Sequence, residues 1–206
     1  MNEETNKVHY DLTNVHIAPM TKTGENPEWG TPTRIYGAIS MDLAAQGETT
    51  KLRADGMDYY VCKANNGYEG DLNLAMVTDW IRINILGDKL SETDKVLIEN
   101  ALSEGKPFAM MFEFLGDQKN RRHVLYNCVA GRPNIKGENK DNPKAPDTET
   151  LSLTASPLAD GKVKASTTEA TPEETYNAWN TKVWVGDGTM TAAAASEPAA
   201  GEQTGG

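Results

Sequence analysis

The sequence predicts a mainly β protein of one domain with one or two short flanking helices. Short apolar or alternating segments recur along the chain, separated by polar stretches rich in Gly, Pro and Asn, a pattern typical of strands joined by turns. The clearest pair is residues 108–114 and 122–130, which are rich in aromatic and β-branched residues and flank the polar sequence GDQKN. These segments predict a hairpin. Both faces of its second strand are largely apolar near the middle, which favours a central position in a sheet.

Length, charge and cysteine content narrow the class of protein. A chain of 206 residues suits a single domain with a real core. Its net charge of −10 argues against adhesion to nucleic acid or anionic membranes. The sequence has no apolar run of about 18 residues and no apolar signal core at its start. Cys62 and Cys128 lie far apart, so we expect two reduced, buried thiols, as in an intracellular product.

The first half of the chain is expected to supply strands that pair with the hairpin. Ile39, Met41 and Leu43 alternate with polar or small residues, and Leu72, Leu74 and Met76 do the same, so each set is predicted to share one buried face. The expected segments are a flexible arm at residues 1–7, strands at 8–18, 39–45, 59–62 and 71–77, and polar loops at 19–33 and 46–58.

Two segments beyond residue 77 carry helix signals. Thr78 is a candidate N-cap for a helix over residues 79–86, with Gly87 as its end. Residues 91–103 are ambiguous, because Ser91-x-x-Asp94 resembles a capping box while Val96-Leu97-Ile98 also suits a short strand.

The last quarter of the chain repeats the strand pattern and then closes the domain. We expect a polar loop at residues 134–147 and a strand at 149–156, with 161–168 as a candidate partner for that strand. Thr171-Pro172-Glu173-Glu174 predicts a helix start capped by Thr171, and Tyr176 and Trp179 share one face of that helix. The ordered domain is expected to end at Val185, because residues 186–206 contain almost no bulky apolar groups and should be mobile.

Chemical motifs are missing from the sequence. His9, His16 and His123 show no metal-ligand spacing, and no nucleophile-elbow, zinc-protease or phosphate-loop motif occurs. The remaining candidates are a calcium loop at Asn139, Asp141 and Asp147, whose spacing matches no EF-hand, and a sugar platform at Trp80, Trp179 and Trp184, for which core packing is the simpler explanation. We therefore predict no catalytic, cofactor or metal site.

Five stretches together resemble a known family. They are PFAMMFEFLGDQKNRRHVLYNCVAGRP, ETLSLTASP and ETYNAWNTKVWV, preceded by YGAISMDL and NNGYEGDLNLAMVTDWIRINILG. Taken in order they resemble the major tail proteins of long-tailed phages that infect Gram-positive bacteria, over residues 7–185. RHVLYNC is the most specific part. In that family the segment VLIEN is a strand, so the resemblance favours a strand over a helix at residues 96–100. Some longer members carry an added Ig-like domain, which we do not expect within these 206 residues.

The resemblance implies a structural role and a tail-tube-type fold, a β-sandwich or partial barrel flanked by helices. Such proteins form hexameric rings that stack into the tube of a long non-contractile tail. DNA passes through the lumen without specific binding, and a tape-measure protein and tail-completion or tip proteins are the other partners. The implied location is the virion, after assembly in the host cytoplasm, with no membrane contact. An acidic chain would discourage DNA from adhering to the conduit.

The resemblance also suggests which residues meet other copies. The polar segment 46–58 is the predicted loop for stacking between rings, through Glu48, Lys51, Arg53, Asp55 and Asp58. The strands at 39–45 and 71–77 are predicted to face the lumen through Ser40, Asp42, Asp71 and Asn73. The alternative for both is ordinary solvated surface. Two other functions stay open: a β-sandwich binding module for carbohydrate or a receptor, and a hydrolase with a site assembled from scattered carboxylates.

Overall fold

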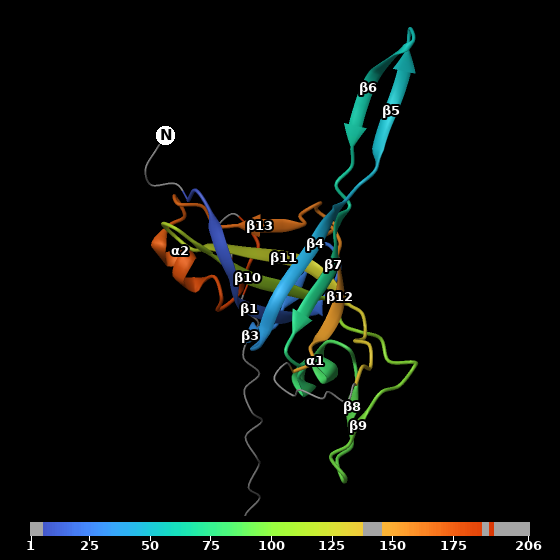
Figure 1. The fold of residues 1–206 in the computed structure, drawn as a ribbon, viewed down its shortest axis with the longest axis vertical. Coiled ribbons are helices and arrows are strands. Elements are labelled where there is room, and N and C mark those ends of the chain that lie inside the picture. Colours follow the sequence, from blue (N-terminus) through green and yellow to red (C-terminus); the bar gives the residue numbers. More distant parts are fainter. Residues whose placement is uncertain (1–5, 138–145, 187–189, 192–206) are drawn as a thin grey trace, which may run out of the picture.

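A computed structural model of the chain describes residues 6–137, 146–186 and 190–191. The described part is mainly β, as predicted, and is built on one nine-stranded antiparallel sheet that does not close into a barrel (Figure 1). The sheet runs in the order β2 (Glu28–Trp29), β1 (His9–Lys22), β10 (Phe108–Gly116), β11 (Arg121–Ala130), β12 (Glu149–Ala155), β7 (Gly67–Leu74) and β4 (Ala38–Gln46), with β3 (Thr33–Arg34) paired to β1 and β13 (Lys164–Ser166) paired to β11.

Smaller elements surround this sheet. Two of them project from opposite ends of the molecule in Figure 1: the hairpin of β5 (Thr49–Ala54) and β6 (Met57–Lys63), and the shorter pair of β8 (Lys89–Leu90) and β9 (Leu97–Ile98). The helices described are α1 (Asp79–Asn84) and α2 (Glu173–Ala178). No described helix has the length and apolar character needed to cross a membrane.

The predicted hairpin, now β10–β11, lies at the centre of the fold and contributes side chains to two hydrophobic clusters. Phe108, Met110 and Phe112 point into one cluster. Ala109 and Met111 point into the other, on the opposite face of the sheet. Each fully buried large side chain stabilises the fold by about 1.5–3 kcal/mol relative to an exposed one. The predicted central position of this hairpin is confirmed.

Buried side chains join the last helix to the sheet. Tyr126 and Leu125 are buried in β11, and Trp179 is buried at the C-terminal end of α2. The Trp179 ring stacks on Trp184 with 5.9 Å between centroids, and its Nε1–H donates to the His123 carbonyl oxygen at 3.4 Å. Trp179 therefore fastens the last helix onto the sheet.

The start of α2 differs from the prediction. Pro172 occupies the N-cap position and no side chain caps the helix. The Thr171 hydroxyl instead accepts a hydrogen bond from the Thr168 amide at 2.8 Å, so the predicted capping box is wrong. Thr78 does sit at the N-cap of α1, without a side-chain cap bond, and the strand at β9 confirms the extended interpretation of residues 97–98.

Pairing within the sheet corrects two further expectations. The predicted loop at residues 19–33 is wrong, because β1 continues to Lys22 and both β2 and β3 pair with it. The segment after β12 does not pair back onto β12. One edge of β12 is occupied by β7 along its whole length, and the other meets only the end of β11. The first half of β11 is thus left for β13, where His123 lies opposite Ser166.

Three predicted burials are wrong. A register shift follows Ala38 in β4, so Ile39 has no cross-strand partner and is 53% exposed. Met76 lies past the end of β7 and is 64% exposed. Cys62 is exposed because β6 projects from the body, whereas Cys128 is buried; both thiols are free.

The two ends of the chain are described only in part. Asn6 and Lys7 hydrogen-bond to the β10–β11 turn. At the other end, β14 (Val183–Trp184) pairs with β15 (Met190–Thr191). The proposed calcium residues Asn139 and Asp141 lie outside the described residues, as does most of the segment predicted to be mobile, so those expectations stay predictions.

Candidate assembly surface

The four residues predicted to face a lumen lie together on one exposed face of β4 and β7. Ser40 is opposite Asn73, and Asn73 is opposite Thr150 on β12. The Asn73 Nδ2 donates to the Ser40 Oγ at 2.9 Å, and the Thr150 Oγ1 donates to the Asn73 Oδ1 at 2.6 Å. These hydrogen bonds form a polar row across three strands.

The next row on this face is acidic. Asp42 and Asp71 are exposed and directly opposite each other, an arrangement that costs stability because like charges repel across strands. Glu69 lies two residues further along β7 and is also exposed. We call residues 38–46 and 67–74 the β4–β7 ribbon. Its two strands contain three acidic residues and no Lys or Arg.

The outer edge of this ribbon is open. The order of the sheet ends at β4, and no described strand pairs with its second edge. The sequence AISMDLAAQ contains neither Lys nor Pro, the residues that commonly block pairing at an edge. From Ser40 to Gln46 the register is regular, so this edge is a ready surface for another strand.

The predicted stacking loop is a β-hairpin. Residues 49–63 form the β5–β6 hairpin, which we call the arm, with its turn at Asp55-Gly56. Both turn residues have positive φ, 52° and 78°, the conformation that Asp-Gly adopts in two-residue hairpin turns. The Asp-Gly pair, followed closely by the run Tyr59-Tyr60-Val61, is the sequence signal that would have found it.

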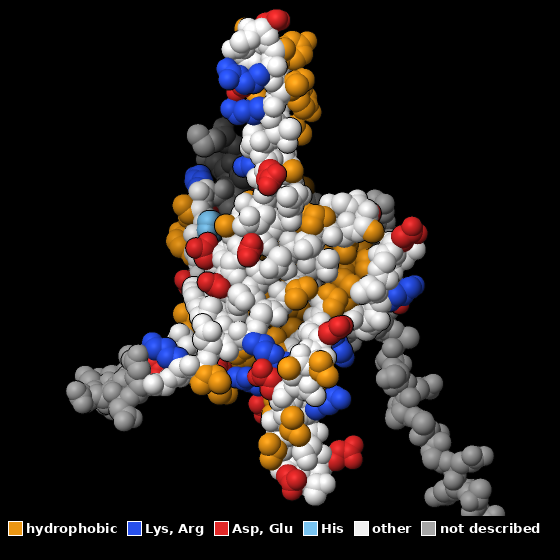
Figure 2. All heavy atoms as spheres, turned by 90° about the vertical axis from the view of Figure 1, so that its right-hand side faces the viewer, with side chains coloured by type: hydrophobic (Ala, Val, Ile, Leu, Met, Phe, Trp, Pro, Cys, Tyr) orange, Lys and Arg blue, Asp and Glu red, His pale blue; other side chains and the backbone are white. Residues whose placement is uncertain are grey.

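The arm has two chemically different faces. One face carries the cations Lys51, Arg53 and Lys63 with Asp58, and also Val61, which lies opposite Lys51. Asp58 forms ion pairs with Lys51 at 2.8 Å and with Arg53 at 3.5 Å. Figure 2 shows these Lys and Arg side chains along one side of the arm and apolar side chains along the other.

The apolar face of the arm is uncovered. It consists of Thr50, Leu52, Ala54, Met57, Tyr60 and Cys62. Leu52, Met57 and Tyr60 are 59%, 63% and 56% exposed. An isolated two-stranded hairpin is marginally stable in water, and a contiguous exposed apolar patch marks an interaction site. Of the predicted stacking residues, the arm carries Lys51, Arg53 and Asp58 on one face and Asp55 at its tip, while Glu48 lies at its base.

A second projection, β8–β9, is held to the body by ion pairs between side chains. The Arg132 Nη1 pairs with the Asp88 carboxylate at 2.7 Å and with the Glu99 carboxylate at 3.2 Å. Asp88 is buried, so this pair fixes the base of the projection. Its outer residues Leu90, Val96 and Ile98 are exposed.

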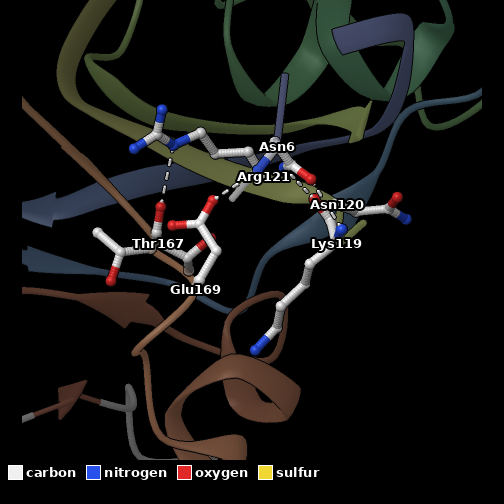
Figure 3. Close-up of a pocket in the computed structure, with 7 residues that line it drawn as sticks. Asn6, Lys119, Asn120, Arg121, Thr167 and Glu169 are labelled. Carbon is white, nitrogen blue, oxygen red and sulfur yellow. Dashed lines mark hydrogen bonds between the residues drawn. The ribbon is translucent and has the colours of Figure 1, made fainter. Parts of the chain in front are cut away.

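The hollow shown in Figure 3 is filled by the chain itself. The Asn6 side chain donates to the Lys119 carbonyl oxygen and accepts hydrogen bonds from the amides of Gln118 and Lys119, both at 2.9 Å. Hydrogen bonds from its own backbone amide and from that of Asn6 lower the pKa of Glu169. The remaining cavity of about 10 Å³ holds roughly one water. The pocket is therefore structural.

A larger hollow beside it, of about 330 Å³, is lined by His9, Phe114 and His123. The His123 ring stacks on Phe112 with 5.1 Å between centroids. Burial, followed by the charges of Lys164, Arg121 and His9, lowers the pKa of His123 to about 4, so its ring is neutral at pH 7. In the described part of the chain, no three His, Cys, Asp or Glu side chains could together hold a metal ion.

No family model matches the chain, and no curated protein does. Among solved structures, it is similar to the anti-feeding prophage cap, a tube-terminating cap, with 8% identity and a TM-score of 0.44 over 82% of this chain and 98% of that one. Similarity at this level does not bear on the function of the chain.

Proposed function

We propose that the protein is a structural virion protein, the major tail subunit of a long non-contractile phage tail. In this role hexameric rings stack into the tube that conducts DNA. The observation that carries the proposal is the arm, because Leu52, Met57 and Tyr60 on its apolar face are more than half exposed. A surface of this kind on a projecting element is explained by assembly with further copies. The sequence resemblance described above supports the same role.

Two other features of the β4–β7 ribbon suit such a tube. The open edge of β4 can join the sheet of a neighbouring copy within a ring, since its backbone groups have no partner strand among the described residues. The acidic and hydroxyl face with Asp42 and Asp71 would then line the lumen. A lumen of that charge repels the phosphate backbone and lets DNA slide. A tape-measure protein and tail-completion or tip proteins would be the remaining partners.

The first test is polymerisation. Purified protein should form rings or tubes in negative-stain electron microscopy. In the control, residues 49–63 are replaced by Gly-Gly, because Glu48 and Ala64 already face each other through a 2.9 Å backbone hydrogen bond and a two-residue turn can join them. This variant should be a folded monomer by circular dichroism and chromatography. Absence of tubes from the full chain, together with glycan binding, would instead favour the binding-module alternative.

A second test addresses the lumen. Asp42→Lys should still form tubes, because the new ammonium can pair with Asp71 across the strands. DNA should be retained by these tubes more strongly at low salt than at high salt. Glu25→Lys makes the same change of charge at an exposed residue off this face and should retain no more DNA than the unmodified tube. Equal retention by both variants would contradict the lumen assignment.

A further inference from the structure

Exposed apolar side chains also gather at the end of the β4–β7 ribbon that lies away from the arm. Tyr36, Ile39 and Met76 are 71%, 53% and 64% exposed. They belong to two adjacent segments, since the Ala75 amide donates to the Gly37 carbonyl oxygen at 2.7 Å. We call these three residues the end patch.

The end patch and the arm are at opposite ends of one ribbon. The arm is inserted where Gln46 pairs with Gly67, and the end patch adjoins the pairing of Ala38 with Leu74. Figure 1 shows the arm rising from one end of β4 and β7, with α1 and β8–β9 at the other end. The arm therefore cannot cover the end patch of its own chain, but an arm of a second copy displaced along this axis can.

The strands of the arm and the strands of the ribbon carry net charge of opposite sign. The strands of the arm carry three cations and one acid. The strands of the ribbon carry three acids and no base. Charge of opposite sign on two elements steers their encounter. Arg34 is the nearby cation on the ribbon side and is already placed over the Tyr36 ring, 4.9 Å from its centroid.

We propose that the apolar face of the arm docks on the end patch of a second copy, head to tail. The inference rests on the proposed function and names the surface that receives the arm. The surface that docks and the surface that receives it are different, so every copy carries both. The contact can therefore repeat along an axis without closing on itself. Leu52, Met57 and Tyr60 of one copy then cover Ile39 and Met76 of the next, while the cations lie on the opposite face of the arm.

The chain contains a free cysteine with which this contact can be tested. Cys62 is exposed on the apolar face of the arm, and Cys128 is fully buried. In the full chain carrying Met76→Cys, a short bismaleimide should link Cys62 to the new thiol between copies. A denaturing gel of assembled protein should show a ladder of dimers and higher multimers. The same chain with Cys62→Ser added should lose the ladder.

Two matched thiols distinguish other receiving surfaces. Ile98→Cys places the thiol on β9, whose exposed apolar residues lie at the same end of the molecule. Thr150→Cys places it on the exposed face of β12. Neither should give the ladder. A ladder from Ile98→Cys with none from Met76→Cys would overturn the end patch as the receiving surface.

Microscopy separates failure of this inference from failure of the proposed function. Tubes that form normally but give no ladder with Met76→Cys overturn the inference alone. If the unmodified chain forms neither rings nor tubes, both are overturned. As a second measurement, Met76→Lys should abolish tubes while its circular dichroism spectrum is unchanged, and normal tubes from this variant would contradict the docking.

Discussion

Two hairpins with similar local sequence patterns have opposite environments in this protein. In β10 the first six residues are all buried, whereas in β5 and β6 every residue except Ala54 is exposed. Both hairpins contain apolar side chains and Tyr. The difference shows that apolar residues of a hairpin stabilise the monomer only where the rest of the chain covers them. In the arm the rest of the chain leaves them exposed.

The comparison is sharpest at two tyrosines. Tyr126→Ala in β11 should lower the free energy of unfolding by about 3–5 kcal/mol, because the ring is buried against Trp29. Tyr60→Ala in the arm should change it by less than about 0.5 kcal/mol. Urea denaturation of the monomer, followed by tryptophan fluorescence, measures both changes in the free energy of unfolding. The strands of the arm contain no Trp, so this signal reports on the body of the protein. Equal losses would mean that the arm is packed in the monomer.

The contact between α2 and the sheet should be nearly as sensitive. Trp179→Ala removes a ring that is 3% exposed and should cost about 3–5 kcal/mol. Asn177→Ala, at an exposed position on the same helix, is the control and should leave the melting temperature unchanged. An unaltered melting temperature for Trp179→Ala would refute its role in fastening the helix.

Ion pairs extend the comparison to polar groups. In the central hairpin, the buried Glu113 carboxylate accepts from the Arg122 Nε at 3.0 Å. Glu113→Ala would leave that guanidinium without its carboxylate and should cost about 3 kcal/mol, since breaking a buried pair is strongly destabilising. Asp58→Ala breaks the exposed pair with Lys51 in the arm and should cost less than about 1 kcal/mol. Thermal unfolding of the two variants measures both losses of stability. A larger loss for Asp58→Ala than for Glu113→Ala would contradict this order.

Acid should weaken the central hairpin through His123. Its pKa is about 4 in the folded protein, against an ordinary value of 6.5. Between these values the unfolded chain binds a proton that the folded chain does not, so this contribution to stability is present above pH 6.5 and is lost as the pH falls towards 4. His123→Phe keeps a ring stacked on Phe112 and should show a smaller drop in melting temperature from pH 7 to 4.5 than the unmodified protein. An identical drop would contradict the assignment.

The candidate surface was predictable only in part. Ser40, Asp42, Asp71 and Asn73 were expected to share one face, because the period of two residues in a strand is visible in the sequence. That β4 and β7 are neighbours, with Asp42 opposite Asp71, could not be read from either segment alone. The end patch was missed entirely. Ile39 and Met76 fit the buried period, and only the register shift and the end of β7 expose them.

The sequence by itself determined the elements whose signals are local. Alternation and aromatic content placed β10 and β11, capping and stop residues placed α1 near Thr78 and Gly87, and Asp55-Gly56 contained the turn of the arm. Tertiary structure decided which neighbour each strand received and which apolar face was covered. The physical reason is that periodicity specifies a strand and its two faces, whereas burial depends on residues distant in the chain. The arm is the clearest case, because its apolar face has the pattern of a core strand and no core against it.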